Sequence, residues 1–396
     1  MQFQVKLSRM IDRDLALEIE KEAAYVSPYL CQLKVTTERT AVDVKVSEGI
    51  VEHEVRGKVE RYLETMLAKF RKIDEKVYFR HQRQDNQPFA TDVYNELKQR
   101  GWLFELGPGH IGLTGLALIL MRKIDETFAK LYYEHFGAIE CIYPALIRAD
   151  LLSKCGYLES HPNTVSLVTH LINDFDVIEE FRQANVEDQK FRIPNKEAIA
   201  TPHICLNPAA CFPCYQSFRG QDIEKEGRVL TWLGRVFRYE STNITGLDRL
   251  WEFNVRELVF IGNDEFVTTS RQKFIQLIEK KLNQWDLECQ IETATDVFFA
   301  TVSGAKTFWQ QSLEVKYEIR LAVEPEKKDE TRSIAGGSIN MHNNFFGNRF
   351  NISCDGQPAF TGCVGLGLER WLLAIFTQHG FEPENWPALL QSDVFG

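Results

Sequence analysis

Strands and helices mix without a regular alternation in the long stretch that follows residue 100. A strict β-α-β-α order would predict a parallel sheet, whereas irregular mixing favours an α+β domain with a mainly antiparallel sheet flanked by helices. The stretch opens with an expected long helix over 112–134, whose apolar residues recur every three or four positions. These residues are Leu113, Leu116, Leu120, Ile124, Phe128 and Leu131. So apolar a helix must be covered on much of its surface.

The first 80 residues show a different pattern. Apolar and polar residues alternate over 2–8, helical spacing covers 13–24, and alternating valines flank a turn at Glu38 and Arg39. An amphipathic stripe then runs through 51–70. We therefore predict a small accessory β-α-β-β-α module over 1–80. A polar, proline-containing stretch predicts a linker over 81–100, and one large domain occupies 101–396.

Charge is distributed unevenly between these parts. The chain has 396 residues and a formal net charge of −10. Residues 1–100 hold 18 Lys+Arg and 17 Asp+Glu, and the remainder holds 28 and 39. An acidic domain is not typical of a nucleic-acid-binding protein, which usually shows a basic surface. The front module is close to neutral, so charge alone does not decide its partner.

The chain shows no sign of membrane targeting. Its start lacks the apolar core of a signal peptide, and its longest apolar run, 111–121, is too short to span a bilayer. The nine cysteines are odd in number and scattered, which is typical of reduced, mostly buried thiols. We expect a cytoplasmic protein with no membrane association.

Two local patterns suggest a binding site. In the first, FRYE (237–240) and RLWEF (249–253) bracket a polar loop between two expected strands. Arginine suits phosphate because its planar fork is permanently charged, and Phe253 offers a face for a planar base. An ordinary β-hairpin with solvent-exposed arginines explains the same stretch of sequence equally well.

In the second pattern, a glycine-rich strand runs into an apolar helix. The stretch GCVGLGLER (362–370) has Gly365 and Gly367 just before the helix and Arg370 in its first turn. Glycines permit close approach of the backbone to a ligand. The stretch is neither a Walker A motif nor a dinucleotide-binding fingerprint, and alone it is weak evidence.

Together these patterns resemble motifs 2 and 3 of the class II aminoacyl-tRNA synthetases. GAIECIYP (137–144) resembles motif 1, which implies a homodimer. Neighbouring stretches such as LNPAACFPCY (206–215) and SINMHNNFFG (338–347) are similar to the zinc-dependent seryl-tRNA synthetases of methanogens. They look still more like the amino acid:[carrier protein] ligases, over roughly residues 100–390.

The resemblance implies roles for individual residues. Cys211, Glu257 and Cys363 match the ligands of one zinc ion, whose open fourth position takes the substrate amine. Three protein ligands with an open place are typical of catalytic zinc, and thiolates favour it over magnesium. Cys214 is expected to be a packed cysteine, and His110 and His342 are given no role.

The resemblance also implies an ATP site. Arg238 and Arg370 match the catalytic arginines, the first at the α-phosphate and the second beside the adenine and γ-phosphate. Phe253 would cover the other face of the adenine. Glu240 and Arg249 would contact the adenine and the outer phosphates, while Gly365 and Gly367 let the backbone approach. The reaction needs positioning and charge stabilisation more than a nucleophilic side chain.

Magnesium is expected to bridge phosphates of the ATP. Many class II enzymes carry an acidic residue on the strand before motif 3, but residues 333–354 contain none. Glu318 and Asn340 are the substitutes that we consider. A surface pair between Glu318 and Lys316 is the simpler interpretation of that carboxylate.

The acceptor divides the functional hypotheses. Our first expectation is transfer of an activated small amino acid to the phosphopantetheine thiol of a carrier protein, since no region like an anticodon-binding domain follows Arg370. The alternative is a seryl-type tRNA ligase in which residues 1–80 bind tRNA. A basic stripe on the second helix would serve that purpose: Arg56, Lys58, Arg61, Lys69, Arg71 and Lys72. A solvated helix face is the simpler explanation of those charges.

A third hypothesis belongs to another class. The chain would be a catalytically inert relative that binds an amino acid or a protein partner. The intact arginines and zinc ligands argue against it, and the identity of the amino acid is not legible beyond serine, glycine or alanine.

Overall fold

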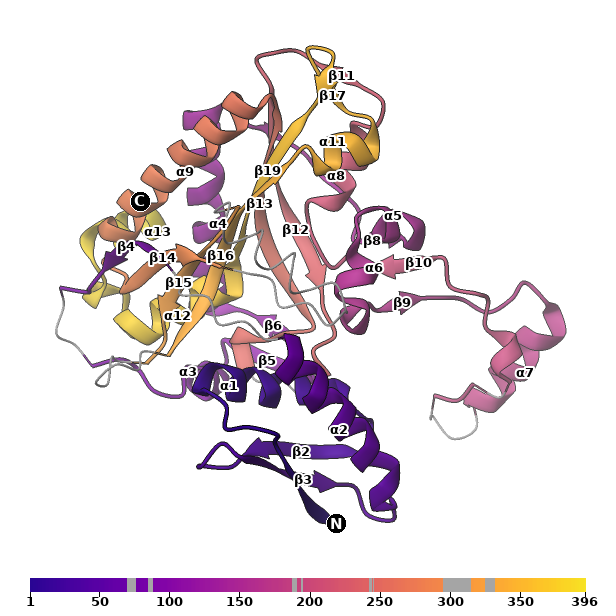
Figure 1. The fold of residues 1–396 in the computed structure, drawn as a ribbon. Helices are drawn as coiled ribbons and strands as arrows, with labels where there is room; N and C mark the ends of the chain where they lie inside the picture. The colour runs from indigo at the N-terminus through magenta and orange to yellow at the C-terminus, as the bar shows by residue number, and fades with distance from the viewer. Residues whose placement is uncertain are drawn as a thin grey trace.

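A computed structural model describes residues 1–69, 76–84, 88–186, 191–193, 195–241, 244, 246–294, 315–324 and 332–396 (Figure 1). Its centre is an eight-stranded sheet in the order β4-β14-β15-β16-β19-β13-β12-β7. All neighbouring strands are antiparallel except β7, which pairs with β12 in parallel. The α+β class with an antiparallel sheet is therefore confirmed. The strands are β4 (Val77–His81), β7 (Ile139–Glu140), β12 (Arg228–Phe237), β13 (Glu252–Gly262), β14 (Cys289–Thr293), β15 (Lys316–Ala322), β16 (Ser333–Asn343) and β19 (Phe360–Gly367).

Long helices cover this sheet. The expected helix over 112–134 is found as α4 (Gly115–Phe136), and Leu113 belongs instead to the preceding strand β6 (His110–Leu113). Leu120, Ile124 and Phe128 of α4 are fully buried, as the apolar stripe predicts. They share one core with the remaining covering helices, α9 (Asp264–Gln284), α12 (Leu368–His379) and α13 (Ala388–Phe395).

The front of the chain has the predicted β-α-β-β-α order. Its elements are β1 (Gln2–Lys6), α1 (Arg13–Glu22), β2 (Leu30–Val35), β3 (Ala41–Val46) and α2 (Glu52–Lys69), with a short 3-10 turn η1 (Ala23–Tyr25) after α1. The strands form a separate sheet in the order β1-β3-β2, and both helices pack on it around a core of their own. Val42, Val44 and Val46 are buried while Asp43 and Lys45 are exposed, so the alternation reports one solvated face.

The linker expected over 81–100 is wrong for part of that range. Residues 93–99 form α3 (Val93–Gln99), and Val93 and Leu97 are buried in the core of the large sheet. Two apolar residues four positions apart are too short a pattern to reveal a helix of this length. The charged stretch EPEKKDETR (324–332), whose composition predicts a solvated loop, lies largely outside the described residues.

Smaller elements complete the large domain. They are β5 (Leu103–Gly107), β8 (Leu146–Arg148), α5 (Ala149–Lys154), α6 (Tyr157–Ser160), β9 (Leu167–Val168), α7 (Phe175–Val186), β10 (Ile204–Leu206), α8 (Phe212–Ser217), β11 (Asp222–Ile223), α11 (Phe345–Phe350), β17 (Ser353–Cys354) and β18 (Gln357–Pro358). Figure 1 shows α7 standing away from the body of the protein. Among the described residues, no helix has the length and apolar character needed to cross a membrane.

Candidate adenylate-forming site

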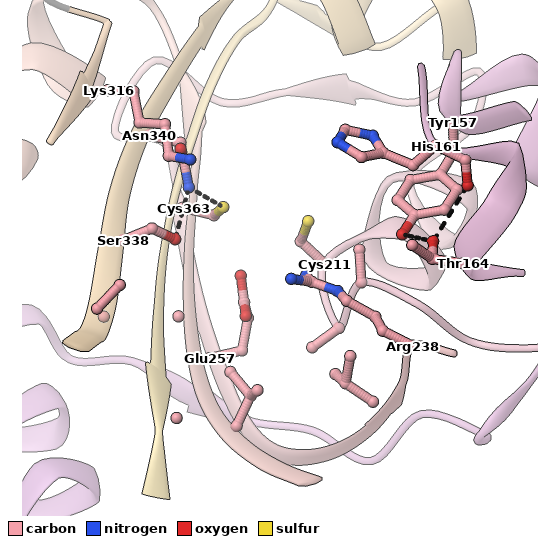
Figure 2. Close-up of a pocket in the computed structure, with 18 of the residues that line it drawn as sticks. Tyr157, His161, Thr164, Cys211, Arg238, Glu257, Lys316, Ser338, Asn340 and Cys363 are labelled. Atoms are coloured by element: carbon pink, nitrogen blue, oxygen red, sulfur yellow. Dashed lines mark hydrogen bonds between the residues drawn. The ribbon is translucent and has the colours of Figure 1, made fainter. Parts of the chain in front are cut away.

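A cavity of about 700 Å³ lies against the sheet where β13, β16 and β19 run side by side. Figure 2 shows its walls: Glu257, Ser338, Asn340 and Cys363 come from the strands, and Cys211 and Arg238 face them. The predicted site residues Arg238, Glu240, Arg249, Phe253, Glu257, Glu318, Asn340, Cys211, Cys363, Gly365, Gly367 and Arg370 all line it. Twelve positions spread over 160 residues of sequence thus meet in one place.

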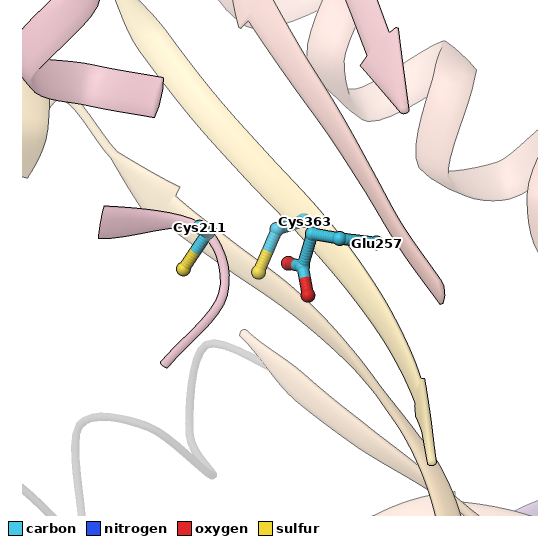
Figure 3. A group of neighbouring side chains, drawn as sticks. All are labelled: Cys211, Glu257 and Cys363. Carbon is cyan, nitrogen blue, oxygen red and sulfur yellow. The ribbon is translucent and has the colours of Figure 1, made fainter. Parts of the chain in front are cut away.

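Three of these residues form a buried cluster with the donor chemistry of a metal site (Figure 3). Cys211, at the start of α8, Glu257 of β13 and Cys363 of β19 are buried, and their ligand atoms all lie within 4.8 Å of one another. Cys363 and Glu257 sit on adjacent strands, whose pairing of Val259 with Cys363 and of Glu257 with Gly365 fixes their separation. Two thiolates and one carboxylate fit zinc and leave a fourth position for another ligand.

The protonation behaviour of the cluster supports this fit. Burial, aided by the neighbouring Cys363, raises the pKa of Glu257 well above its usual range. The hydrogen bond with Cys211, together with burial, raises the pKa of the Cys363 thiol in the same direction. Three acidic groups cannot all ionise in one buried place unless a cation compensates them. The three groups would therefore ionise together only with a bound cation.

Gly365 makes room for this cluster. A Cβ atom at Gly365 would lie 3.1 Å from Oε2 of Glu257 and 3.3 Å from a methyl group of Val255. A Cβ atom at Gly367 would meet nothing closer than 3.9 Å. A side chain at position 365 would thus press on the carboxylate beside it, whereas Gly367 borders the cavity without that restriction.

The two arginines are anchored by backbone carbonyl groups. Arg238 donates from Nε to the carbonyl of Pro208 at 2.9 Å, and its guanidinium lies 5.6 Å from the centre of the Phe253 ring. Arg370 donates to the carbonyls of Asp248 and Ala335, each at 2.9 Å. Burial, followed by the like charge of Arg238, lowers the pKa of Arg370. Two cations converging on one cavity favour an anionic ligand there.

Glu240 and Arg249 lie near the two ends of the loop between β12 and β13. Their side chains form an ion pair of 2.9 Å, and both are about three-quarters buried. The strands on either side pair from Phe237 and Glu252 inward, as the expected strand-loop-strand arrangement requires. The pair fixes the charged ends of this loop at the cavity wall.

The two residues considered for magnesium lie in different surroundings. Glu318 pairs with Lys316 at 3.4 Å and with Arg320 at 3.3 Å, which matches the simpler strand-face interpretation. Asn340 donates to Ser338 Oγ at 3.2 Å and to Cys363 Sγ at 3.6 Å. Asn340 thus donates to a thiol of the buried cluster, and a magnesium role for either residue stays a prediction.

Three further residues lie at or beside the site, although the sequence predicts no role in binding for any of them. Glu369 is buried and accepts hydrogen bonds from the backbone and side-chain amides of Asn254, at 3.0 Å and 2.7 Å, which ties α12 to β13. Nε2 of His342 lies 3.7 Å from Sγ of Cys363. Cys214 is buried in α8 beside this region and is not part of the cluster.

The N-terminal module also reaches the cavity. Glu22 and Tyr25, at the end of α1 and in η1, belong to its lining. Nothing in the pattern of residues 1–80 indicates this contact, because it depends on how the module packs against residues more than 200 positions away. The contact is seen only in the folded structure, where the module is hydrogen-bonded to the loop after β12.

Comparison with known proteins agrees with this geometry. The family model of the tRNA synthetase class II core domain (G, H, P, S and T) matches residues 195–379. The matched range contains every predicted site residue. Residues 195–379 of the chain are thus similar to a class II aminoacyl-tRNA synthetase core domain.

Curated relatives of the chain include type-2 serine–tRNA ligases. The type-2 serine–tRNA ligase of Methanocaldococcus jannaschii is 31% identical over 310 residues, which cover 77% of this chain and 59% of that protein. The type-2 serine–tRNA ligase of Methanopyrus kandleri is 26% identical and covers 76% and 59%. The chain thus spans about three-fifths of the length of these relatives.

Solved structures share the synthetase fold. M. kandleri SerRS, in complex with A. aeolicus tRNASec, aligns with a TM-score of 0.73 at 22% identity, covering 99% of this chain and 77% of that one. The cytoplasmic serine–tRNA ligase of Naegleria fowleri in complex with AMP aligns with a TM-score of 0.59 at 11% identity, covering 87% and 71%. At these identities the likeness establishes the fold alone.

Proposed function

We propose that this chain activates serine with ATP and transfers the seryl group to tRNA. The observation that carries the proposal is the buried cluster of Cys211, Glu257 and Cys363 in the same cavity as Arg238 and Arg370. A metal site that would bind an amine thus lies next to two arginines whose charge suits phosphate groups. The named activity of the relatives supports serine and tRNA as substrate and acceptor.

Activation would join the amino acid and ATP. A carboxylate oxygen of serine attacks the α-phosphorus, the bond from that phosphorus to the bridging oxygen breaks, and pyrophosphate leaves. Arg238 and Arg370 would stabilise the charge that develops on the phosphate oxygens. Phe253, beneath Arg238, would stack against the adenine. When bound, zinc would accept the substrate amine as its fourth ligand, held by Cys211, Glu257 and Cys363.

The second step would release AMP. A ribose hydroxyl of the tRNA attacks the carbonyl carbon of the seryl adenylate, the bond to the phosphate oxygen breaks, and the hydroxyl proton is lost to solvent or phosphate. The cavity contributes by holding the carbonyl carbon in place, since positioning is the main requirement of such a transfer. Magnesium on the ATP phosphates remains part of the proposal, with Glu318 and Asn340 of the cavity lining as its candidate ligands.

Our first expectation, that a carrier protein accepts the aminoacyl group, loses support. The comparisons favour a tRNA ligase over a carrier-protein ligase, because the relatives reported above are serine–tRNA ligases. On the structure, Arg56 of the expected basic stripe is paired with Glu52 at 2.5 Å and with Glu60 at 3.7 Å. Arg71 and Lys72 lie outside the described residues. Lys58 and Arg61 of the stripe are exposed on α2 and remain available for a tRNA contact.

A homodimer remains part of the proposal. The motif 1 segment forms β7 at the edge of the large sheet, and it leaves Ile139 55% and Ile142 91% exposed. An apolar sheet edge of this kind is usually covered by another chain. Light scattering of the purified protein would show a mass near twice 45.8 kDa if the proposal holds.

The test separates the two steps. ATP–pyrophosphate exchange is measured with each of the twenty amino acids, and serine is expected to support the fastest exchange. Charging is then measured with total tRNA and, separately, with a holo carrier protein. Transfer to the carrier alone would reinstate carrier-protein ligation. Exchange with no amino acid at all would leave only an inert, ligand-binding relative.

A further inference from the structure

Two hydrogen bonds join the N-terminal module to the loop that follows β12. The phenol of Tyr25 donates to the carbonyl of Tyr239 at 3.2 Å, and Oγ of Ser241 donates to the carbonyl of Ala24 at 3.3 Å. The first bond spans 214 positions of sequence and the second 217. The module is therefore attached at the wall of the cavity.

The residue between the two attachment points is Glu240. Its carboxylate pairs with Arg249 at 2.9 Å, and both residues line the cavity. The backbone on each side of Glu240 is thus held from outside the large domain. Small shifts of this backbone would move the ion pair.

The conformation of Ser241 shows that this backbone needs support. Its φ is +54°, in the left-handed region that residues other than glycine rarely adopt. Such a conformation persists only where the surrounding structure holds it. The hydrogen bond from Ser241 Oγ to the module is one such restraint.

We propose that Tyr25 is a positioning residue for nucleotide binding, by which the N-terminal module holds residues 239–241 so that Glu240 and Arg249 face the nucleotide. This inference rests on the proposed function for the identity of the nucleotide, ATP. It assigns the module a role in activation, whatever acceptor it also binds.

Tyr25 suits this role at any working pH. Burial, with a further contribution from the nearby Glu240 carboxylate, raises the pKa of its phenol. The hydroxyl thus stays protonated and remains a donor. Its ring also forms part of the cavity lining, so the side chain links the module to the ligand space directly.

Coupling between sites is reciprocal. If the docked module favours nucleotide binding, bound nucleotide must favour the docked module. A partner that binds the module would then change the rate of amino-acid activation without contacting the cavity.

The test compares Tyr25→Phe with Tyr62→Phe in the full chain. The phenol of Tyr62 donates to the carbonyl of Ile19 at 2.8 Å inside the module, so this variant loses the same kind of bond without touching the loop. Titration calorimetry with a non-hydrolysable ATP analogue is expected to show binding roughly 3–10-fold weaker in Tyr25→Phe, the loss of about one hydrogen bond. Tyr62→Phe should bind as the wild type does.

Kinetics provide the second measurement. In serine-dependent exchange, Tyr25→Phe should raise the KM for ATP by a similar factor while the KM for serine changes less than about twofold, since the serine contacts are untouched. Ser241→Ala should act in the same direction as Tyr25→Phe.

The outcomes are distinguishable from those of the proposed function. Unchanged binding in Tyr25→Phe, or equal weakening in both tyrosine variants, would overturn the inference. A wild-type chain that binds the analogue but supports no exchange would overturn the proposed function and leave the calorimetric comparison valid. A wild-type chain that binds no nucleotide would overturn both.

Discussion

The large sheet and the N-terminal module contribute to the same cavity in different ways. In the sheet, the registers of β13 and β19 place Glu257 and Cys363 directly, because each lies on a buried strand with its neighbours paired. The module contributes through η1 and the end of α1, held by two hydrogen bonds. Side chains on paired strands are held rigidly. The position of side chains on a docked module depends on how that module packs against the sheet domain.

The largest expected effect lies on the sheet side. Arg238→Ala should lower ATP–pyrophosphate exchange by about 10²–10³-fold, because a preorganised charge at the phosphate is lost. Arg235→Ala is the matched control: Arg235 lies near the end of β12, three residues before Arg238, but is 65% exposed and paired with Glu252. Exchange by that variant should stay within about twofold of wild type. Equal losses in the two variants would remove the assigned role of Arg238.

The glycines of β19 test how closely the strands are fitted. Gly365→Ala should weaken zinc binding by about 10–100-fold, since the new Cβ displaces the Glu257 carboxylate. Gly367→Ala has no such contact and should bind zinc normally. Competition with a chromogenic chelator measures both. Normal zinc affinity in Gly365→Ala would show that the carboxylate is not a ligand.

The pH dependence of zinc binding follows from the raised pKa values of Glu257 and Cys363. In the metal-free chain these groups hold their protons to higher pH than ordinary carboxyl and thiol groups. Zinc binds the ionised forms, so protons must leave and affinity should fall as the pH falls. We expect binding about tenfold or more weaker at pH 6 than at pH 8. An affinity independent of pH would contradict a thiolate and carboxylate site.

The smallest expected effect lies on the module side. Lys58 and Arg61 are exposed on α2, and acidic residues such as Glu60 are interspersed with them. Changing both to glutamate should leave exchange unchanged and lower tRNA charging by less than about threefold, because a mixed face binds phosphate weakly. A loss greater than tenfold would establish a tRNA-binding stripe on α2.

Prediction from sequence succeeded where local patterns report local structure. The alternating valines predicted the hairpin around Glu38 and Arg39, and the apolar stripe predicted α4 with its start and its end displaced by three and two residues. The motifs on β12, β13 and β19 brought the site residues into one cavity because those strands are neighbours in the sheet.

What sequence could not provide depends on contacts between distant segments. Val93 and Leu97 are core residues only because a sheet and α12 lie against α3. A helix is therefore found where a linker was expected. Tyr25 gained its place at the cavity by docking to the loop after β12. Neither contact has a periodicity or motif that a single sequence displays.

The central claim is that Cys211, Glu257 and Cys363 hold a zinc ion that the activation of serine requires. Metal content and serine-dependent ATP–pyrophosphate exchange are measured together on the wild-type chain and on Cys211→Ala, with circular dichroism to confirm folding. The wild type should carry about one zinc per chain and exchange pyrophosphate, and the folded variant should lose both. A Cys211→Ala variant that keeps its zinc and its full exchange activity would contradict the account.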